Sequence, residues 1–190
     1  MMNNEKTLTK TENDIIITDV KRELPSYGLK TYVLYRCDRL VRKTAEGNLI
    51  PALGNPETPI LLSQMALSLG LSLSEAEIGS IAEANGLYLW DDNGICAIAR
   101  VAFVGEKYAR INTVFTSPEK RGHGYAGALV SSLAEKLISE GLTPTVLADE
   151  ENPVSNHLYL SLGFTPDGRI YEYSKIGVCH KENAIFYRTV

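Results

Sequence analysis

The chain has 190 residues, of which 44% are hydrophobic and 22% charged, and its formal net charge at pH 7 is −4. These values are typical of a globular protein with one sizeable core, and they exclude a disordered chain. The N-terminus is polar, and no apolar run approaches the roughly 18 residues needed to cross a bilayer. We therefore expect a cytoplasmic protein with no membrane partner.

The cysteines and histidines indicate neither a disulfide framework nor a metal site. The three cysteines are odd in number, far apart and without zinc-ligand spacing, which predicts reduced, buried or half-buried thiols. The histidines form no ligand set either, so we expect no metal. The residues concerned are Cys37, Cys96, Cys179, His123, His157 and His180.

The first quarter of the chain is mildly basic and gives few signals. Residues 1–13 have the polar composition of a flexible tail, and we expect residues 14–190 to form a single domain. Two β-branched and aromatic runs, Ile15-Ile16-Ile17 and Tyr32-Val33-Leu34-Tyr35, predict strands. The role of this quarter stays open.

A pair of helices is predicted next. Pro59 to Leu69 has a helical pattern, and Ser72 with Glu75 predicts a capping box for a second helix that ends near Asn85-Gly86. Such a pair can be compared with a DNA-binding helix-turn-helix, but its charge is wrong. From Pro51 through Ala99 there is no Lys or Arg, whereas several acidic residues lie there: Glu57, Glu75, Glu77, Glu83, Asp91 and Asp92. Since nucleic-acid affinity depends largely on neutralising phosphates, we expect no nucleic-acid partner.

A hairpin and a further strand follow. Leu87 to Trp90 and Ile95 to Phe103 flank Asp92-Asn93-Gly94, which is a strong signal for a tight turn. A second turn at Gly105 leads into a β-branched strand, Arg110-Ile111-Asn112-Thr113-Val114-Phe115-Thr116, which Ser117-Pro118 ends. This order predicts an antiparallel meander.

The segment Arg121-Gly122-His123-Gly124-Tyr125-Ala126 joins this strand to a long amphipathic helix. The helix is predicted from apolar residues on one face, and Gly141 is placed to end it; the face comprises Ala126, Leu129, Val130, Leu133, Ala134, Leu137 and Ile138. Amides at a helix N-terminus have no partner within the helix, so they can bind phosphate, and the glycines let a ligand approach the backbone. The segment therefore predicts an anion cradle.

Two other phosphate-binding loops have sequence patterns close to this segment. A nucleoside-triphosphatase loop needs Gly-Lys before Ser or Thr, but Tyr125-Ala126 follows Gly124. The string Gly122 to Gly127 does match the dinucleotide pattern Gly-x-Gly-x-x-Gly, yet the downstream acid Glu140 closes a helix rather than a strand. The glycine string alone therefore does not identify the ligand.

A second polar motif lies further along the chain. Asn152 can cap a helix that starts at Pro153 and ends before Gly163, which predicts a helix over residues 153–162. Asn152, Asn156 and Tyr159 then share one helical face. Val154, Leu158 and Leu162 mark a different, apolar face.

These two motifs together carry a resemblance to a known family. Arg121-x-x-Gly124-x-Ala126, after the strand end at Val114 to Pro118, resembles the acyl-CoA pyrophosphate loop of the GNAT superfamily of N-acetyltransferases. The stretch Asp149 to Tyr159, with Gly163-Phe164, is similar to the Asn-Pro-x-Ser-Asn-x-x-Tyr and Gly-Phe/Tyr motifs of the same superfamily. With the strands around them, the motifs cover about residues 86–173.

The resemblance implies a fold. It implies an α/β protein with a GNAT-type mixed, mostly antiparallel central sheet flanked by helices. In such a sheet a splayed parallel strand pair holds acetyl-CoA. Here the pair would be the strand that ends at Val114 to Thr116 and the strand Thr145-Val146-Leu147-Ala148. The strand-helix-strand connection between them is expected to be right-handed.

It also implies a reaction, the transfer of an acetyl group from acetyl-CoA to an amine by direct attack on the thioester. Tyr159 would be the catalytic acid, and a positioned acid typically contributes about 10² to 10⁴ in rate. The residues expected to bind acetyl-CoA are Val114, Phe115, Thr116, Arg121, Gly122, His123, Gly124, Tyr125, Ala126, Asn152 and Asn156.

Several alternatives stay open at this stage. Asn152 can be a simple helix cap, Asn156 a surface residue and Tyr159 a half-buried aromatic. The stretch Ala109 to Thr113 has no carboxylate where many relatives carry a glutamate, so the general base is unassigned. The acidic run Asp149-Glu150-Glu151 supplies candidates or is a solvated turn.

The missing carboxylate also permits a catalytically silent acyl-CoA sensor or interaction module. The acceptor can be a small molecule or a protein amine, and the acidic predicted helices suit a cationic amine or are simply a solvated face. The segment after Tyr173, including Cys179 to Glu182 and Ala184 to Tyr187, can be a strand, a contact in a homodimer or part of the cleft.

Overall fold

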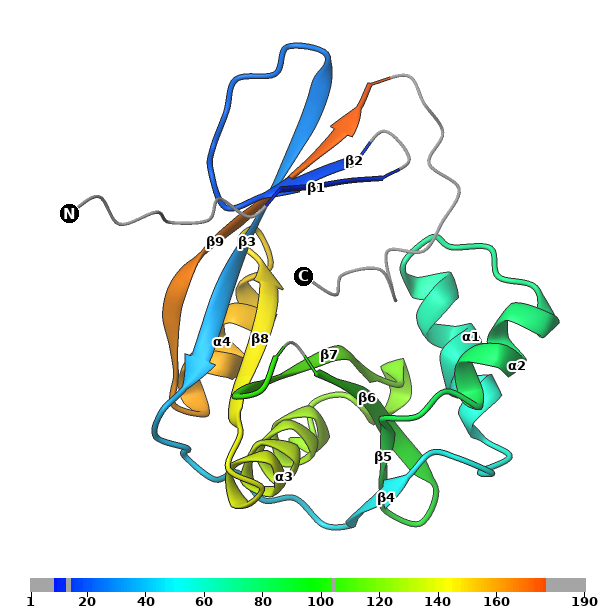
Figure 1. The fold of residues 1–190 in the computed structure, drawn as a ribbon. Helices are drawn as coiled ribbons and strands as arrows, with labels where there is room; N and C mark the ends of the chain where they lie inside the picture. The colour runs from blue at the N-terminus through cyan, green and yellow to red at the C-terminus, as the bar shows by residue number, and fades with distance from the viewer. Residues whose placement is uncertain (1–8, 13–14, 104, 177–190) are drawn as a thin grey trace.

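The computed structural model describes residues 9–12, 15–103 and 105–176. Within these residues, nine strands form one sheet in the order β1-β2-β9-β3-β8-β7-β6-β5-β4 (Figure 1). The strands are β1 Thr9–Glu12, β2 Ile15–Thr18, β3 Tyr27–Cys37, β4 Asn48–Pro51, β5 Leu87–Asp91, β6 Ile95–Phe103, β7 Tyr108–Thr116, β8 Thr143–Asp149 and β9 Phe164–Lys175. The helices are α1 Thr58–Ser68, α2 Glu75–Ala82, α3 Tyr125–Ser139 and α4 Pro153–Ser161, with a short 3₁₀ helix at Pro118–Lys120.

The sheet is mostly antiparallel and has one parallel pair, β7 with β8. This pair is short. It joins Tyr108 to Thr143, Ala109 to Pro144 and Arg110 to Thr145 in the described part of the chain. Beyond Arg110 the two strands diverge, as the resemblance predicted, and the mixed α/β fold with helices flanking the sheet is confirmed.

Two apolar clusters lie on opposite faces of the sheet. Along β6, Ala97 and Ala99 belong to the cluster beneath α3, whereas Ile98 between them belongs to the cluster beneath α1, as the two-residue period of a strand requires. Leu129 and Leu133 of α3 are fully buried in the first cluster, as the predicted apolar face requires, whereas Ile138 at the end of that face is exposed. Gly141 adopts φ of +80° and Leu142 N–H donates to Leu137 O, so the helix ends where the sequence predicted.

The second helix starts two residues later than the pattern predicted. The capping box is formed by Ser74 and Glu77, not by Ser72 and Glu75, and the helix ends at Ala82. The reason is packing, because Leu71 and Leu73 lie against the cluster beneath α1 and hold the preceding segment out of the helix.

Three strands have no counterpart in the sequence predictions. β1 falls within the segment expected to be a flexible tail, while residues 1–8 lie outside the described part. β4 pairs with β5, and β9 is a long strand between β2 and β3. A register shift at Leu34/Tyr35 leaves Asp167 of β9 as an extra residue, so the turn-like sequence Pro166-Asp167-Gly168 is accommodated as a bulge.

Two further sequence predictions concern the cysteines and the expected lack of a membrane-spanning segment. Cys37 and Cys96 are free and buried, as expected, and burial raises the pKa of the Cys37 thiol to about 11. Cys179 and the segments Cys179 to Glu182 and Ala184 to Tyr187 lie outside the described residues. None of the helices in the described ranges is long and apolar enough to cross a membrane.

Candidate functional site

A pocket opens where β7 and β8 diverge. Its volume is about 210 Å³, which is below the ~300–1,000 Å³ of sites that enclose a whole drug-sized ligand, so it fits the reactive end of a larger one. Four elements line it: α1 with Met65 and its C-cap Leu69, β7 with Arg110 and Asn112 to Phe115, β8 with Leu147 to Asp149, and α4 with Ser155 and Tyr159.

A bulge in β7 forms one wall of this pocket. Ile98 pairs with Phe115 and Arg100 pairs with Asn112, so Thr113 and Val114 together face Ala99 alone. Thr113 takes φ of +56°, a conformation that a β-branched residue adopts only under constraint. Bulges of this kind redirect the backbone, and this one lies where β7 has already parted from β8. The β7 edge at Val114 to Thr116 is therefore available to a ligand.

The loop after β7 has the open backbone that an anion cradle needs. Gly122 and Gly124 both have φ of +82°, and a Cβ at Gly122 would meet nothing within 4 Å. Gly124 is the N-cap of α3, and no side chain in the described ranges caps the helix there. The first intrahelical bond is from Ala128 N–H to Gly124 O, at 3.0 Å, so the amides before Ala128 point out of the helix.

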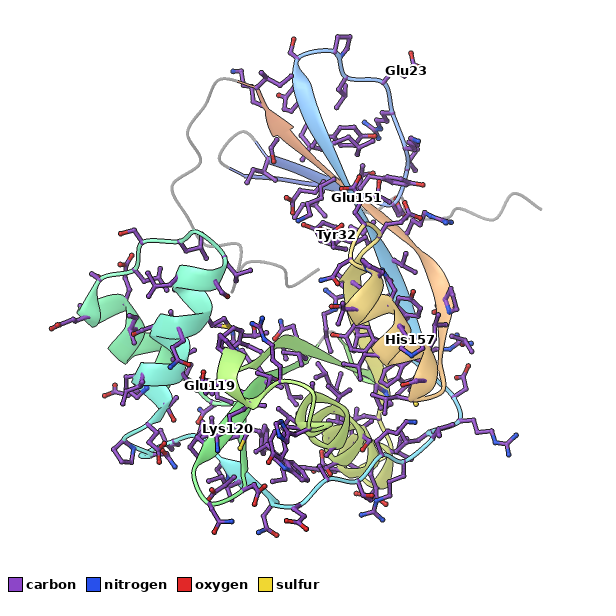
Figure 2. All side chains as sticks on the ribbon, turned by 180° about the vertical axis from the view of Figure 1, so that it is seen from behind. Glu23, Tyr32, Glu119, Lys120, Glu151 and His157 are labelled. Atoms are coloured by element: carbon purple, nitrogen blue, oxygen red, sulfur yellow. The ribbon has the colours of Figure 1, made fainter. Side chains whose placement is uncertain are left out.

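Side chains of the loop hold it in place from two sides. Arg121 Nε donates to Thr116 O at 3.2 Å, and its guanidinium lies 5.7 Å from the centre of the Phe115 ring. The His123 ring stacks on Tyr125, and the Tyr125 hydroxyl donates to Asp92 Oδ2 at 2.6 Å. This hydrogen bond raises the pKa of Tyr125 to about 12. Lys120, which is labelled in Figure 2, immediately precedes this loop in the chain.

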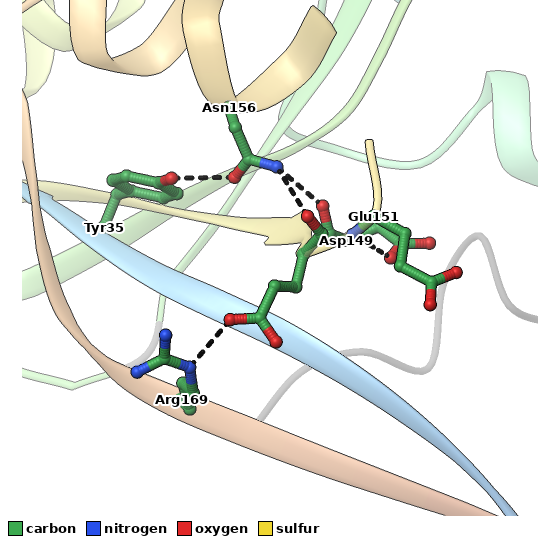
Figure 3. Close-up of polar contacts among 6 residues, drawn as sticks. Tyr35, Asp149, Glu151, Asn156 and Arg169 are labelled. Carbon is green, nitrogen blue, oxygen red and sulfur yellow. Dashed lines mark hydrogen bonds and ion pairs between the residues drawn. The ribbon is translucent and has the colours of Figure 1, made fainter. Parts of the chain in front are cut away.

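The two asparagines of the second motif hold the turn between β8 and α4. Asn152 accepts a hydrogen bond from Ser155 N–H at 3.1 Å, as an N-cap does. Asn156 Nδ2 donates to Asp149 O at 2.8 Å, and its Oδ1 accepts from the Tyr35 hydroxyl at 2.7 Å (Figure 3). The same Nδ2 also donates to Asn152 O at 2.7 Å. Both side chains are thus engaged within the protein.

Tyr159 lies on the inner side of α4. It is 6% exposed, and its ring packs 6.1 Å from Tyr35 and 6.0 Å from Phe164, measured between ring centres. Burial raises the pKa of its hydroxyl to about 12, so the group is protonated at neutral pH. Val154, which the sequence placed on an apolar face, is instead 77% exposed. The other two residues of that face agree with the prediction, because Leu162 is fully buried and Leu158 packs against the same cluster as Tyr159.

The acidic run at the end of β8 is tied to basic partners. Asp149 lines the pocket, and its carboxylate is 2.7 Å from Lys30 Nζ and accepts from Glu151 N–H. Glu150 pairs with Arg169 at 2.8 Å. Both carboxylates are thus engaged in ion pairs within the protein.

Sequence reasoning missed several groups at the site. Arg110 lines the pocket and is only 4% exposed, although a charged residue in a strand is usually expected to face solvent. Burial lowers the pKa of its guanidinium. A second missed group is the segment around Lys43 and Ala45, which runs past Gly124 and Gly127. Its basic composition was visible, but its place beside the loop is set by tertiary packing.

Comparison with known proteins agrees with this architecture. Residues 94–173 match the family model of FR47-like protein. The fold is similar to a GNAT-family protein of Novosphingobium aromaticivorans, with a TM-score of 0.63, 18% identity, and coverage of 88% of this chain and 77% of that one. The fold is also similar to an acetyltransferase of the GNAT family from Colwellia psychrerythraea, with a TM-score of 0.61, 17% identity, and coverage of 79% of this chain and 58% of that one. No curated protein sequence matches the chain.

A GCN5-related N-acetyltransferase from Sphaerobacter thermophilus is also similar, with a TM-score of 0.59, 14% identity, and coverage of 78% of this chain and 52% of that one. The chain thus spans just over half the length of the second and third of these proteins. The protein has the GNAT fold, and the resemblance to the superfamily that its motifs predicted is confirmed. At these identities the likeness concerns the fold alone.

Proposed function

We propose that the protein is an N-acetyltransferase that moves an acetyl group from acetyl-CoA to an amine. The observation that carries this proposal is that the bulged edge of β7 and the buried Tyr159 line one pocket, at the mouth of a diverging strand pair. Acetyl-CoA would supply the activated acyl group as a thioester.

The loop fits the diphosphate of such a ligand. Gly122 has no side chain to keep a ligand from the backbone of the loop. The amides at the start of α3, which have no partner within the helix, and the helix dipole both favour an anion there. Arg121 and His123 extend from the same loop and add positive or hydrogen-bonding groups. The residues Arg121 to Ala126 would therefore bind the diphosphate.

The edge of β7 would bind the next part of the ligand. Backbone groups of Val114, Phe115 and Thr116 can pair with an extended arm in the place of a neighbouring strand. A backbone N–H at the bulge would polarise the thioester carbonyl, and such preorganised donors are worth several kcal/mol in acyl transfer. Positioning would supply most of the acceleration.

Tyr159 would donate to the sulfur as it leaves. A phenol with its pKa raised to about 12 is a weaker acid than a thiol, whose ordinary pKa is ~8.5, so donation of a hydrogen bond is favoured over full transfer of the proton. Asn152 and Asn156 would act indirectly, because they fix the turn that positions Tyr159. We assign no general base, and the proton of the amine would leave through solvent.

The test is release of CoA from acetyl-CoA in the presence of a panel of amines and peptides. Turnover with at least one acceptor, together with saturable binding of acetyl-CoA, is the expected result. Binding without turnover across the panel would instead support a catalytically silent acyl-CoA sensor. Absence of binding would overturn both.

A further inference from the structure

Two residues of α4 that carry hydroxyl groups, Ser155 and Tyr159, line the pocket. They are one helical turn apart, so their side chains lie on the same face of α4, with Cβ atoms about 5–6 Å from each other. Side chains in a helix lean toward its N-terminus, which brings the longer tyrosine over the turn that holds Ser155. Both hydroxyls therefore belong to one wall of the pocket.

Neither hydroxyl has a hydrogen-bond partner in the part of the chain that the structure describes. The contact of Ser155 with the helix cap is made by its backbone N–H, which donates to Asn152 Oδ1 at 3.1 Å, so its Oγ takes no part in that turn. Burial alone raises the pKa of Tyr159, with no contribution from a neighbouring charge or hydrogen bond. Since polar groups that are buried or half-buried normally have a partner, both hydroxyls are placed to bind a ligand in the pocket.

The reacting part of the proposed ligand would lie opposite these hydroxyls. The thioester would be held at the bulge of β7, where Val114 lines the pocket, and a pocket of about 210 Å³ brings it close to α4. The charged residues of the walls are already engaged, because Arg110 interacts within the protein and the carboxylate of Asp149 is 2.7 Å from Lys30 Nζ. Charge that develops on the sulfur therefore needs donors of another kind.

We propose that Ser155 is a second catalytic residue, whose hydroxyl donates a hydrogen bond to the departing sulfur beside the one from Tyr159. This inference deepens the proposed function and rests on it. The sulfur of a thioether is a weak acceptor, and we expect the same of the uncharged thioester, whereas hydrogen bonds to a charged acceptor are about twice as strong as neutral ones. The two bonds thus strengthen as the thiolate forms, which favours the transition state over the bound substrate.

The reaction remains balanced with two hydroxyl donors. The amine nitrogen forms a bond to the acyl carbon, the carbon–sulfur bond breaks, and its electron pair goes to the sulfur. The amine gives one proton to solvent, and the thiolate takes one proton from solvent when it leaves the pocket as CoA. Ser155 and Tyr159 keep their own protons throughout.

The direct test is the pH dependence of CoA binding to the full chain, because free CoA places a thiol where the sulfur departs. A thiol whose pKa is lowered in the complex ionises before the free thiol does, so CoA affinity rises with pH between the two values. Desulfo-CoA, in which hydrogen replaces the thiol, cancels the effect of every other titrating group. Calorimetry at pH 6 to pH 10 gives the ratio of the two affinities.

We expect this ratio to rise with pH in the wild type and to rise about tenfold less in Ser155→Ala, as the loss of one hydrogen bond to a charged group predicts. Ser155→Thr keeps the hydroxyl and should keep the rise. Ser161→Ala is the matched control on the same helix, because the Ser161 hydroxyl donates to Leu158 O at 2.8 Å and Ser161 does not line the pocket. It should leave the ratio unchanged.

Turnover gives a second readout. Ser155→Ala should lower kcat by about 10-fold and leave the affinity for acetyl-CoA unchanged, because the uncharged thioester gains little from the hydroxyl. A change confined to the KM of the amine would place Ser155 against the acceptor instead and would overturn the inference.

The inference is also overturned if the affinity ratio does not rise in the wild type, or rises equally in Ser155→Ala. These outcomes differ from failure of the proposed function. In that case acetyl-CoA and CoA do not bind, or no amine is acetylated, whereas failure of this inference alone leaves binding and turnover intact and independent of the Ser155 hydroxyl.

Discussion

The N-termini of α3 and α4 lie at the same edge of the sheet, because each helix follows one strand of the parallel pair, yet they are finished in opposite ways. The N-cap of α3 is Gly124, which has no side chain to cap the helix. The N-cap of α4 is Asn152, whose side chain accepts a hydrogen bond from Ser155 N–H. Asn156 donates a hydrogen bond to the backbone oxygen of Asn152 in the same turn. The first terminus has the open amides that the proposed diphosphate site requires, whereas side chains close the second, on the helix that carries Tyr159.

The largest expected effect is at the open terminus. Gly124→Asp should weaken acetyl-CoA binding by more than about 100-fold, because a side chain at φ of +82° strains the loop and its charge repels a diphosphate. Calorimetric titration measures this.

A matched control is available at the other end of the same helix. Gly141 has φ of +80° and also has open space around its missing Cβ, so Gly141→Asp introduces similar strain away from the ligand. It should lower the melting temperature and leave acetyl-CoA affinity unchanged. Equal loss of affinity in both variants would show that strain alone explains the first result.

The next largest effect is expected at Tyr159. Tyr159→Phe should lower kcat by about 100-fold with little change in acetyl-CoA affinity, because it removes the donor to the leaving sulfur and keeps the ring packing. Steady-state kinetics measures kcat, and calorimetry measures affinity. Tyr108→Phe, the same change on an exposed residue of β7, serves as the control.

The pH dependence sharpens this prediction. The raised pKa of about 12 keeps Tyr159 in its donating form throughout the range below pH 10, and the form is lost only as the pH rises through that value. Turnover with saturating substrates should therefore not fall between pH 8 and pH 10. A decline centred near pH 9 that disappears in Tyr159→Phe would contradict the assignment.

A smaller effect is expected from the turn that holds α4. Asn156→Ala removes hydrogen bonds to Asp149 O, Asn152 O and the Tyr35 hydroxyl, and should lower the free energy of unfolding by about 2–3 kcal/mol. Urea denaturation measures the loss. A lower kcat in the same variant would show that the turn positions Tyr159, whereas a change of less than about 0.5 kcal/mol would show that the turn is held by other contacts.

The smallest effect is expected at the cap itself. Asn152→Ala should cost about 1 kcal/mol of stability, as the loss of an N-cap does, with acetyl-CoA affinity unchanged. The same denaturation and titration experiments apply. If affinity falls while stability is unaffected, Asn152 contacts the ligand, and the comparison between the two helix termini fails.

The sequence predicted the elements whose signals are local. α3 has an uninterrupted apolar face between Gly124 and Gly141, and the β5–β6 hairpin has Asn93-Gly94 at its turn, so both could be placed within a residue or two. The divergence of β7 and β8 followed from the resemblance of the motifs. These features depend little on distant parts of the chain.

The features that sequence reasoning missed depend on tertiary contacts. β9 contains Pro166 and Gly168, which indicate a turn, but pairing on both sides and a bulge hold them in a strand. Thr113 favours ordinary strand geometry, and its positive φ occurs at the register shift between β6 and β7. Arg110 is 4% exposed in the wall of a pocket built from elements far apart in the sequence, and a charged side chain in a strand does not reveal this.

The central claim is that the amides at the start of α3 bind the diphosphate of acetyl-CoA. Titration of acetyl-CoA into the full chain, at two temperatures so that a vanishing enthalpy cannot hide binding, tests it most directly. We predict saturable one-to-one binding that Gly124→Asp abolishes and Gly141→Asp preserves. Absence of binding by the wild type at both temperatures would contradict the account.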